Sequence, residues 1–335
     1  MTTEAKIQLT SSELGILWMI YTSQSATLTV FNLFKDKTID IEAQNILSTF
    51  ITDTTNIKNM IINLFNNENV VIPLGISEQD IVSEAPPLYD DIFNIMNLRR
   101  ATKLFAGRMG VFCVMTYMKE VNDILKLGFE ISNKYYMMTT NYLLGKGLLT
   151  KSPYVTMPKQ VEFIEDKNYL SGYNILSDKR SLDTIEVGYI SEAIENNILD
   201  MKFLTGFAQV ATEIEVKKYF IEGIELLKKH ITELCNMLLQ SDIELPNTRA
   251  GIVTDSTKSP FSDKLMMYVN SLISSTPLGF TALGTSFSMR NDLPIKLGLI
   301  SKDKLDYAKE GSKIMIKYKW MEQPPQMKDR NSLTK

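Results

Sequence analysis

The sequence predicts an all-α protein made of two tandem four-helix bundles. Three observations support this: the chain repeats itself at an offset of 173 residues, each repeat opens with a helix-capping motif, and strand-like alternation is nearly absent. The 335 residues suffice for two domains, and 44% apolar with 22% charged residues is typical of globular proteins. We expect a first bundle over 8–149, a connector over 150–181, a second bundle over 182–326 and a frayed tail over 327–335.

The repeat rests on residues that recur without a gap over about 80 positions. Glycine and proline are among the matches, and these residues constrain the backbone more than others do. The matching pairs include Leu9 with Leu182, Gly15 with Gly188, Phe34 with Phe207, Pro73 with Pro246, Pro87 with Pro260 and Asp90 with Asp263. Near the ends, Pro153 matches Pro325 at an offset of 172. A tandem duplication is therefore predicted.

Each repeat is expected to contain four long helices. Thr10 to Glu13 and Asp183 to Glu186 form capping boxes, which place an oxygen side chain three residues before a glutamate at a helix start. Pro87 and Pro260 are expected at the first position of the third helix, where the missing N–H does no harm. The expected helices are 11–36, 40–67, 88–117 and 119–146, then 183–210, 213–240, 261–290 and 293–319. Short turns within each helix pair and one long crossover between pairs are typical of ferritin-like bundles.

Two long runs carry no charge, 14–34 and 265–289. Both are rich in Ser and Thr, and this composition favours buried helices over membrane spans. A helix without charge on any face is usually surrounded by protein, so we expect these two to pack at the junction between the bundles. An apolar cavity is expected there, among Trp18, Phe31, Phe34 and the small residues of 274–288.

Composition argues against several classes of function. The net charge of −3 gives no basic field for phosphate, so no nucleic-acid partner is expected. Two cysteines and no secretory signal at the start predict a cytoplasmic location. A phosphate loop, a nucleophile elbow and a Cys-x-x-Cys pair are all missing from the sequence. This leaves enzymatic activity uncertain and favours a protein that is not an enzyme.

Several runs carry a family resemblance. They are SPYVTMPKQVEF (152–163), YLSGY (169–173), SPFSDKLMM (259–267) and WMEQPPQ (320–326). In these runs the chain resembles an uncharacterised family of tandem ferritin-like bundles from spore-forming bacilli. The resemblance implies the fold and association with the forespore or spore, and it implies no established activity. The aromatic residues of the connector, Tyr154, Phe163, Tyr169 and Tyr173, predict that it packs against a bundle.

Ferritin-like folds suggest a di-metal site, which needs a Glu from each of two helices and Glu-x-x-His from each of the others. The only histidine is His230, and Leu227 stands where the motif requires Glu. The matching position in the first repeat is Ile57, so a complete site fails in both copies. A degenerate site for Fe, Mn or Zn remains an alternative, and its candidate ligands are His230, Glu233, Glu192 and Glu195. A packing histidine at the core edge, bonded to a neighbouring oxygen, is favoured over this site.

A basic patch lies on the expected third helix, at Arg99, Arg100, Lys103 and Arg108. Ion pairing at the surface or between the bundles is favoured over an anionic partner. Taken together, the residues predict a non-catalytic, soluble helical-bundle protein that binds a protein partner or a small apolar ligand. An oligomer is compatible with this reading. The metal protein with a site near His230 is the alternative.

Overall fold

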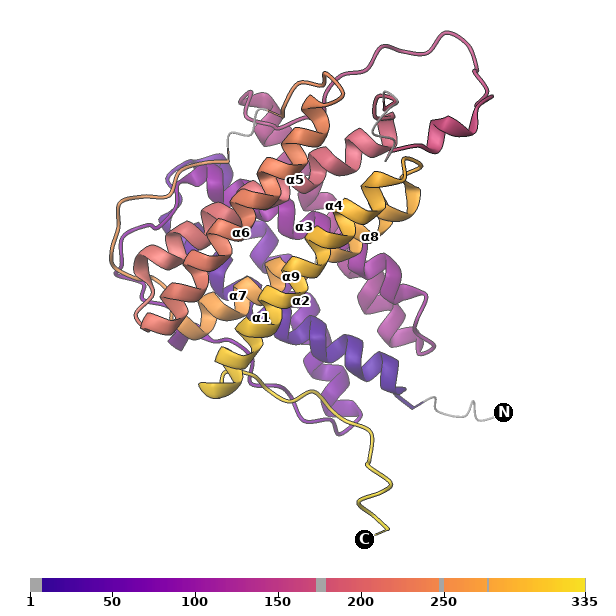
Figure 1. The fold of residues 1–335 in the computed structure, drawn as a ribbon. Coiled ribbons are helices and arrows are strands. Elements are labelled where there is room, and N and C mark those ends of the chain that lie inside the picture. Colours follow the sequence, from indigo (N-terminus) through magenta and orange to yellow (C-terminus); the bar gives the residue numbers. More distant parts are fainter. Residues whose placement is uncertain (1–7, 173–178, 247–249, 276, 335) are drawn as a thin grey trace.

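The computed structural model describes residues 8–172, 179–246, 250–275 and 277–334. Over these ranges its regular elements are helices, and no β-strand is present (Figure 1). We call α1 to α4 the N-terminal helices and α5 to α9 the C-terminal helices. The α-helices are α1 (Ser11–Lys37), α2 (Ile41–Asn67), α3 (Asp91–Cys113), α4 (Lys119–Gly145), α5 (Thr184–Val210), α6 (Ile214–Leu239), α7 (Asp263–Ser275), α8 (Pro277–Phe287) and α9 (Asp292–Lys317). Short 3₁₀ helices cover Glu78–Asp80 and Lys167–Leu170.

Helix bounds agree with expectation within two residues, except for the third helix of each repeat. The helix α3 begins at Asp91, three residues later than predicted, and ends earlier, at Cys113. The single helix expected over 261–290 is two helices, and Pro277 is the first residue of the second. Proline has no N–H to continue a helix and collides with the preceding turn, which explains the division.

The two crossovers pair with each other, which explains why Pro87 and Pro260 do not begin helices. Isolated antiparallel bridges join Ile81 to Phe261 and Tyr89 to Val253. Adding 172 to 81 and 89 gives 253 and 261, so one bridge reproduces the other. The flanking backbone bonds follow the same rule: Val82 N to Pro260 O at 2.9 Å with Thr254 N to Leu88 O at 3.0 Å, and Ser262 N to Asp80 O at 2.8 Å with Asp90 N to Ile252 O at 3.1 Å.

Two aspartates hold the turns before α2 and α6. The Asp91 carboxylate accepts from the two backbone N–H groups ahead of α2 at 3.0 and 2.8 Å. The Asp263 carboxylate accepts from the two ahead of α6 at 3.1 and 2.7 Å. Asp263 is therefore structurally equivalent to Asp91, whereas the repeat in the sequence pairs Asp263 with Asp90. The register of the repeat differs by one residue here.

Two fully buried glutamates connect the helix starts to the turns that precede α4 and α9. Glu13 accepts from Thr10 N at 2.9 Å within its capping box, and from Tyr117 N at 2.7 Å and Met118 N at 2.6 Å. Burial opposes ionisation of Glu13, but these backbone hydrogen bonds outweigh it and lower its pKa to about 2. Glu186 likewise accepts from the backbone of 289 and 290, at 3.2 and 3.0 Å. Each glutamate therefore has two roles: it caps the helix on which it lies, and it binds the backbone of a distant turn.

The largest core cluster runs through both sets of helices instead of being divided between them. Phe93 of α3 and Phe203 of α5 have ring centroids 5.0 Å apart, and Phe34 of α1 lies 6.4 Å from Phe261, just before α7. The expected contact between the charge-free helices is present, since α1 contacts α7. Two smaller clusters belong to the N-terminal and the C-terminal helices separately. Shared aromatic packing therefore joins the two sets of helices.

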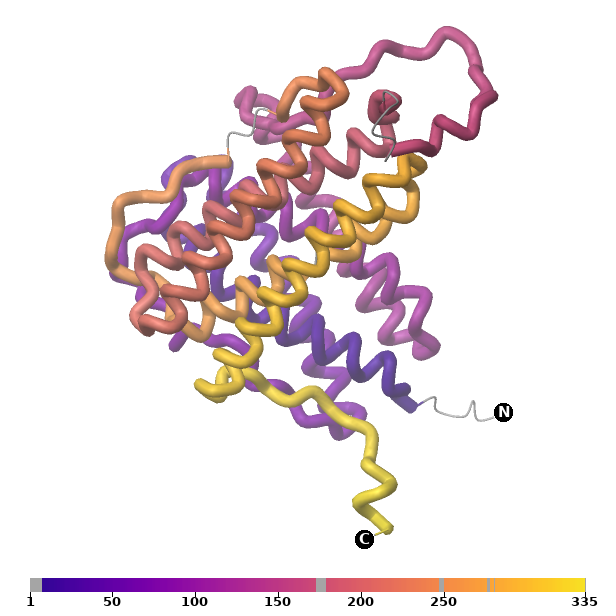
Figure 2. The backbone as a smooth tube through the Cα atoms, viewed as in Figure 1, coloured from indigo at the N-terminus to yellow at the C-terminus, as the bar shows by residue number. Residues whose placement is uncertain are grey.

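The connector differs from expectation over most of its length. Figure 2 shows it as a long loop that projects from the helices. Tyr154 is 88% exposed and Phe163 is 84% exposed, so these two residues do not show the expected packing. Tyr169 is half-buried near the end of the connector, and Tyr173 lies outside the described residues. In the tail, 327–334 is exposed. None of the described helices combines the length and apolar character that crossing a membrane requires.

Candidate functional site at the junction of the helices

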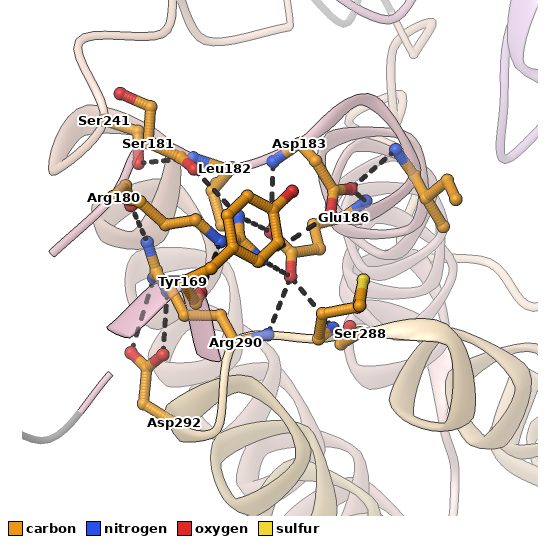
Figure 3. A network of polar contacts seen from close by, with 12 residues as sticks. Tyr169, Arg180, Ser181, Leu182, Asp183, Glu186, Ser241, Ser288, Arg290 and Asp292 are labelled. Atoms are coloured by element: carbon orange, nitrogen blue, oxygen red, sulfur yellow. Dashed lines mark hydrogen bonds and ion pairs between the residues drawn. The ribbon is translucent and has the colours of Figure 1, made fainter. Parts of the chain in front are cut away.

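The end of the connector is clamped by a saturated polar network, shown in Figure 3. The Arg180 guanidinium donates to both carboxylate oxygens of Glu186 at 2.8 Å and lies 4.2 Å from the Tyr169 ring centroid. Arg290 donates to the backbone oxygen of Arg180 at 3.0 Å and to Asp292 at 2.8 Å. The charged groups of this network already bond one another, so we assign it a structural role.

A second polar layer joins α3 to α5. Arg99 pairs with Glu195 at 2.9 Å, and Lys103 lies 3.4 Å from the same carboxylate and also pairs with Glu192. Arg100 pairs with Asp200 one turn further along. Ion pairing, the preferred interpretation of the basic patch, is confirmed for these three cations, which pair with carboxylates of α5. It also means that Glu192 and Glu195 are engaged by cations of α3.

The pair of Arg100 and Asp200 is deeply buried. Burial raises the pKa of Asp200, although Arg100 and Lys304 act in the opposite direction. Lys304, whose Nζ is 4.0 Å from the Asp200 carboxylate, has its pKa lowered by burial. Removing charges from water is unfavourable, so the burial of this pair is not by itself a source of net stability.

Arg108, the fourth residue of the basic patch, differs from the other three. Within the described ranges it forms no ion pair, and its guanidinium lies 4.5 Å from the ring centroid of Phe105. Its Nε is buried and has no hydrogen-bond partner among the described residues. Burial lowers the pKa of Arg108 to about 10, which still leaves the group charged at pH 7.

Arg108 and Arg100 line an apolar cavity of about 80 Å³ where α1, α3, α5 and α7 meet. The other lining residues are Thr27, Val30, Phe31, Asn97, Ala101, Leu104, Phe105, Phe203, Val269, Leu272 and Ile273. Several of them, including Phe105 and Arg108, are only half-buried, so the cavity reaches solvent on that side. Buried atoms without a described partner, Arg100 Nε and Asn97 Oδ1, also belong to lining residues.

The cavity is offset from the one that the sequence predicted. Phe31 lines it as expected, but Trp18 and Phe34 do not, and neither do the described residues of 274–288. The C-terminal helices contribute Phe203 and the middle of α7 instead. The division of the expected third helix is the reason, because α8 packs against α5 and α9.

The residues proposed as metal ligands are not gathered into one cluster. His230 is fully buried, its Nε2 lies 3.4 Å from the Asp303 carboxylate, and burial lowers its pKa. Glu192 and Glu195 face the cations of α3, and Glu233 is half-buried and does not bond to His230. Across the described ranges, no group of three or more His, Cys, Asp or Glu residues could hold a metal ion.

The centre of the N-terminal helices, where a ferritin-like metal site would lie, does not fit such a site. A small cavity of about 20 Å³ there is lined by apolar and neutral polar side chains, and the polar ones include Gln24, Thr54, Thr102 and Ser132. Two of their atoms, Gln24 Oε1 and Thr54 Oγ1, have no described partner. Amide and hydroxyl groups do not supply the carboxylate and imidazole ligands of a di-metal centre.

Comparison of the chain with known protein families and structures identifies similar proteins. The sequence model of DUF3231, described as a protein of unknown function, matches residues 1–161 and again 171–333. A search of curated proteins finds no match. Among solved structures, the chain is similar to a candidate spore coat protein from Bacillus halodurans, with 17% identity and a TM-score of 0.41. That likeness covers 45% of this chain and 98% of the other.

Proposed function

We propose that this protein, which belongs to the DUF3231 family of proteins of unknown function, acts without catalysis by binding a small apolar ligand at the junction of its helices. The observation that carries the proposal is the cavity between α1, α3, α5 and α7. Binding pockets are typically apolar with a few polar groups that orient the ligand, and this cavity has that composition.

The volume limits the size of the ligand. An engineered protein cavity of about 150 Å³ stays dry and binds benzene or xenon. The junction cavity, at about 80 Å³, is roughly half that size. A short alkyl group fits this space, and a longer ligand would extend past the half-buried Phe105 and Arg108 towards solvent.

We further propose that the site arose between two duplicated, ferritin-like four-helix bundles. The support is that the crossover bridges reproduce each other at an offset of 172. Glu13 and Glu186 have matching bonds to the turns, as do Asp91 and Asp263. The family model also matches the chain twice. In this account duplication created a junction, and the cavity is a product of it.

Calorimetric titration with short alkanols, 1-butanol to 1-octanol, tests ligand binding. Ala101 lines the cavity, and Ala101→Leu would fill part of it with three added carbon atoms. Ala282→Leu adds the same atoms at an exposed position of α8 and serves as the matched control. We expect the wild type and Ala282→Leu to bind alike and Ala101→Leu to bind at least tenfold more weakly. Absence of binding in the wild type, or no effect of Ala101→Leu, would contradict the proposal.

A protein partner is the second candidate, because the connector exposes apolar side chains. Met157 is 72% exposed and Val161 is 83% exposed, and Phe163 follows two residues later. A second copy of the chain is the first partner to test. We expect light scattering to detect a dimer that dissociates in the double variant Val161→Ser, Phe163→Ser. A monomer at every concentration would exclude a second copy.

We also propose a cytoplasmic location, with spore association as the family resemblance implies. Fractionation of sporulating cells, followed by immunodetection, tests this location. A metal protein with Fe, Mn or Zn near His230 remains the alternative function, and metal analysis separates it from ligand binding.

A further inference from the structure

We infer that the ligand of the junction cavity is a small alkyl carboxylate, whose charged group pairs with Arg108 while its alkyl chain enters the cavity. This inference rests on the proposed function and names the chemical class of its ligand. It starts from the charges that α3 and α5 bring to the junction.

Among the cations of α3 at the junction, Arg108 differs in having no carboxylate partner among the described residues. Arg99, Arg100 and Lys103 each pair with a carboxylate of α5. Arg108 lies two turns beyond Arg100 on the same helix, and no carboxylate of the described residues lies within ion-pair distance of it. A partly buried guanidinium with a buried, unpartnered Nε is unfavourable unless an anion or another acceptor completes it.

The surroundings of Arg108 select the kind of anion. A guanidinium matches a planar carboxylate with two parallel hydrogen bonds, and the Arg108 guanidinium lies 4.5 Å from the Phe105 ring centroid. Leu104, Val269 and Ile273 form the adjoining cavity wall, which suits an alkyl chain and not a second charge. Arg100, which is only 4% exposed and pairs with Asp200, lines the same cavity and has a buried Nε–H without a described partner. A short fatty acid has both required parts.

Titration calorimetry of the full chain compares hexanoate with 1-hexanol and hexyl phosphate. We expect hexanoate to bind at least tenfold more tightly than 1-hexanol, a difference of about 1.4 kcal/mol. Arg108→Met should remove this preference, so that hexanoate and 1-hexanol bind the variant with similar affinity. Arg108→Lys should keep part of the preference. Arg330→Met, in the exposed tail, is the matched control and should behave as the wild type.

The outcomes separate this inference from the function on which it rests. Equal affinity of the wild type for hexanoate and 1-hexanol would refute a carboxylate ligand, and so would an unchanged preference in Arg108→Met. Either result would leave the proposed apolar binding site unaffected. Tighter binding of hexyl phosphate than of hexanoate would also overturn it, in favour of a phosphate ligand. If none of the three compounds binds, the proposed function fails as well. Melting temperatures of the variants, close to the wild type, verify that each is folded.

Discussion

Glu13 should contribute more to stability than any capping residue does alone. Its carboxylate accepts hydrogen bonds from the backbone and hydroxyl of Thr10, and from Tyr117 N and Met118 N before α4. In Glu13→Gln the side chain loses its charge, and one oxygen is replaced by an NH₂ group that faces N–H donors. At least one of these donors would then be buried without an acceptor.

The magnitude follows from the pKa of Glu13. The fold lowers it from 4.5 to about 2, and each unit is worth about 1.36 kcal/mol, so ionised Glu13 stabilises the fold by about 3 kcal/mol. Because the pKa is lowered in the folded state, this contribution is complete above pH 4.5 and is lost as the pH falls towards 2.

Urea unfolding of the wild type and Glu13→Gln, followed by circular dichroism from pH 7 to pH 3, measures this contribution. We expect the variant to be less stable by about 3 kcal/mol at pH 7, with a gap that narrows as the pH falls. Glu186→Gln is the matched variant in the second repeat, and it should also lose stability, since the pKa of Glu186 is lowered too. A loss below about 1 kcal/mol at pH 7, or a gap independent of pH, would refute this reasoning.

Three further predictions test other contacts. Gly206 of α5 lies against the Tyr89 ring so closely that a methyl group would overlap it. Gly206→Ala should therefore destabilise the fold by about 1–3 kcal/mol despite its better helix propensity, as measured by urea unfolding; a gain in stability would contradict the contact. Asp91→Ala and Asp263→Ala should each lose about 1 kcal/mol; losses that differ several-fold in the same assay would argue against equivalent roles. Metal analysis of protein purified without chelators or a His tag, beside His230→Ala, should find no metal that depends on His230; near-stoichiometric Fe, Mn or Zn lost in the variant would favour the metal alternative.

Local sequence signals predicted the helices well and the junction poorly. The capping boxes at Thr10 and Asp183 mark helix starts because they depend only on residues three positions apart. The prediction that Pro87 and Pro260 begin helices was wrong, because bridges between the two crossovers hold the following residues extended. Nothing in the local sequence indicates that pairing. Pro277 did carry the signal that divides α7 from α8.

The candidate site was only partly visible in the sequence. The basic patch on α3 was found, and ion pairing at the surface or between the bundles was favoured over an anionic partner. That Arg108 differs from the other three could not be predicted, because it depends on which carboxylates of α5 face which turn of α3. Glu192 and Glu195 looked like metal ligands because their partners lie on a distant segment. The DUF3231 match confirms that the chain belongs to a family of unknown function, matched over two regions.

Crystals of the full chain under xenon pressure would test the central claim most directly, because xenon enters apolar cavities independently of ligand identity. The account predicts a xenon atom bounded by Phe31, Leu104 and Ile273, and its loss in Ala101→Leu. Xenon bound elsewhere in the protein with none at this junction would contradict the claim that the cavity is a ligand site.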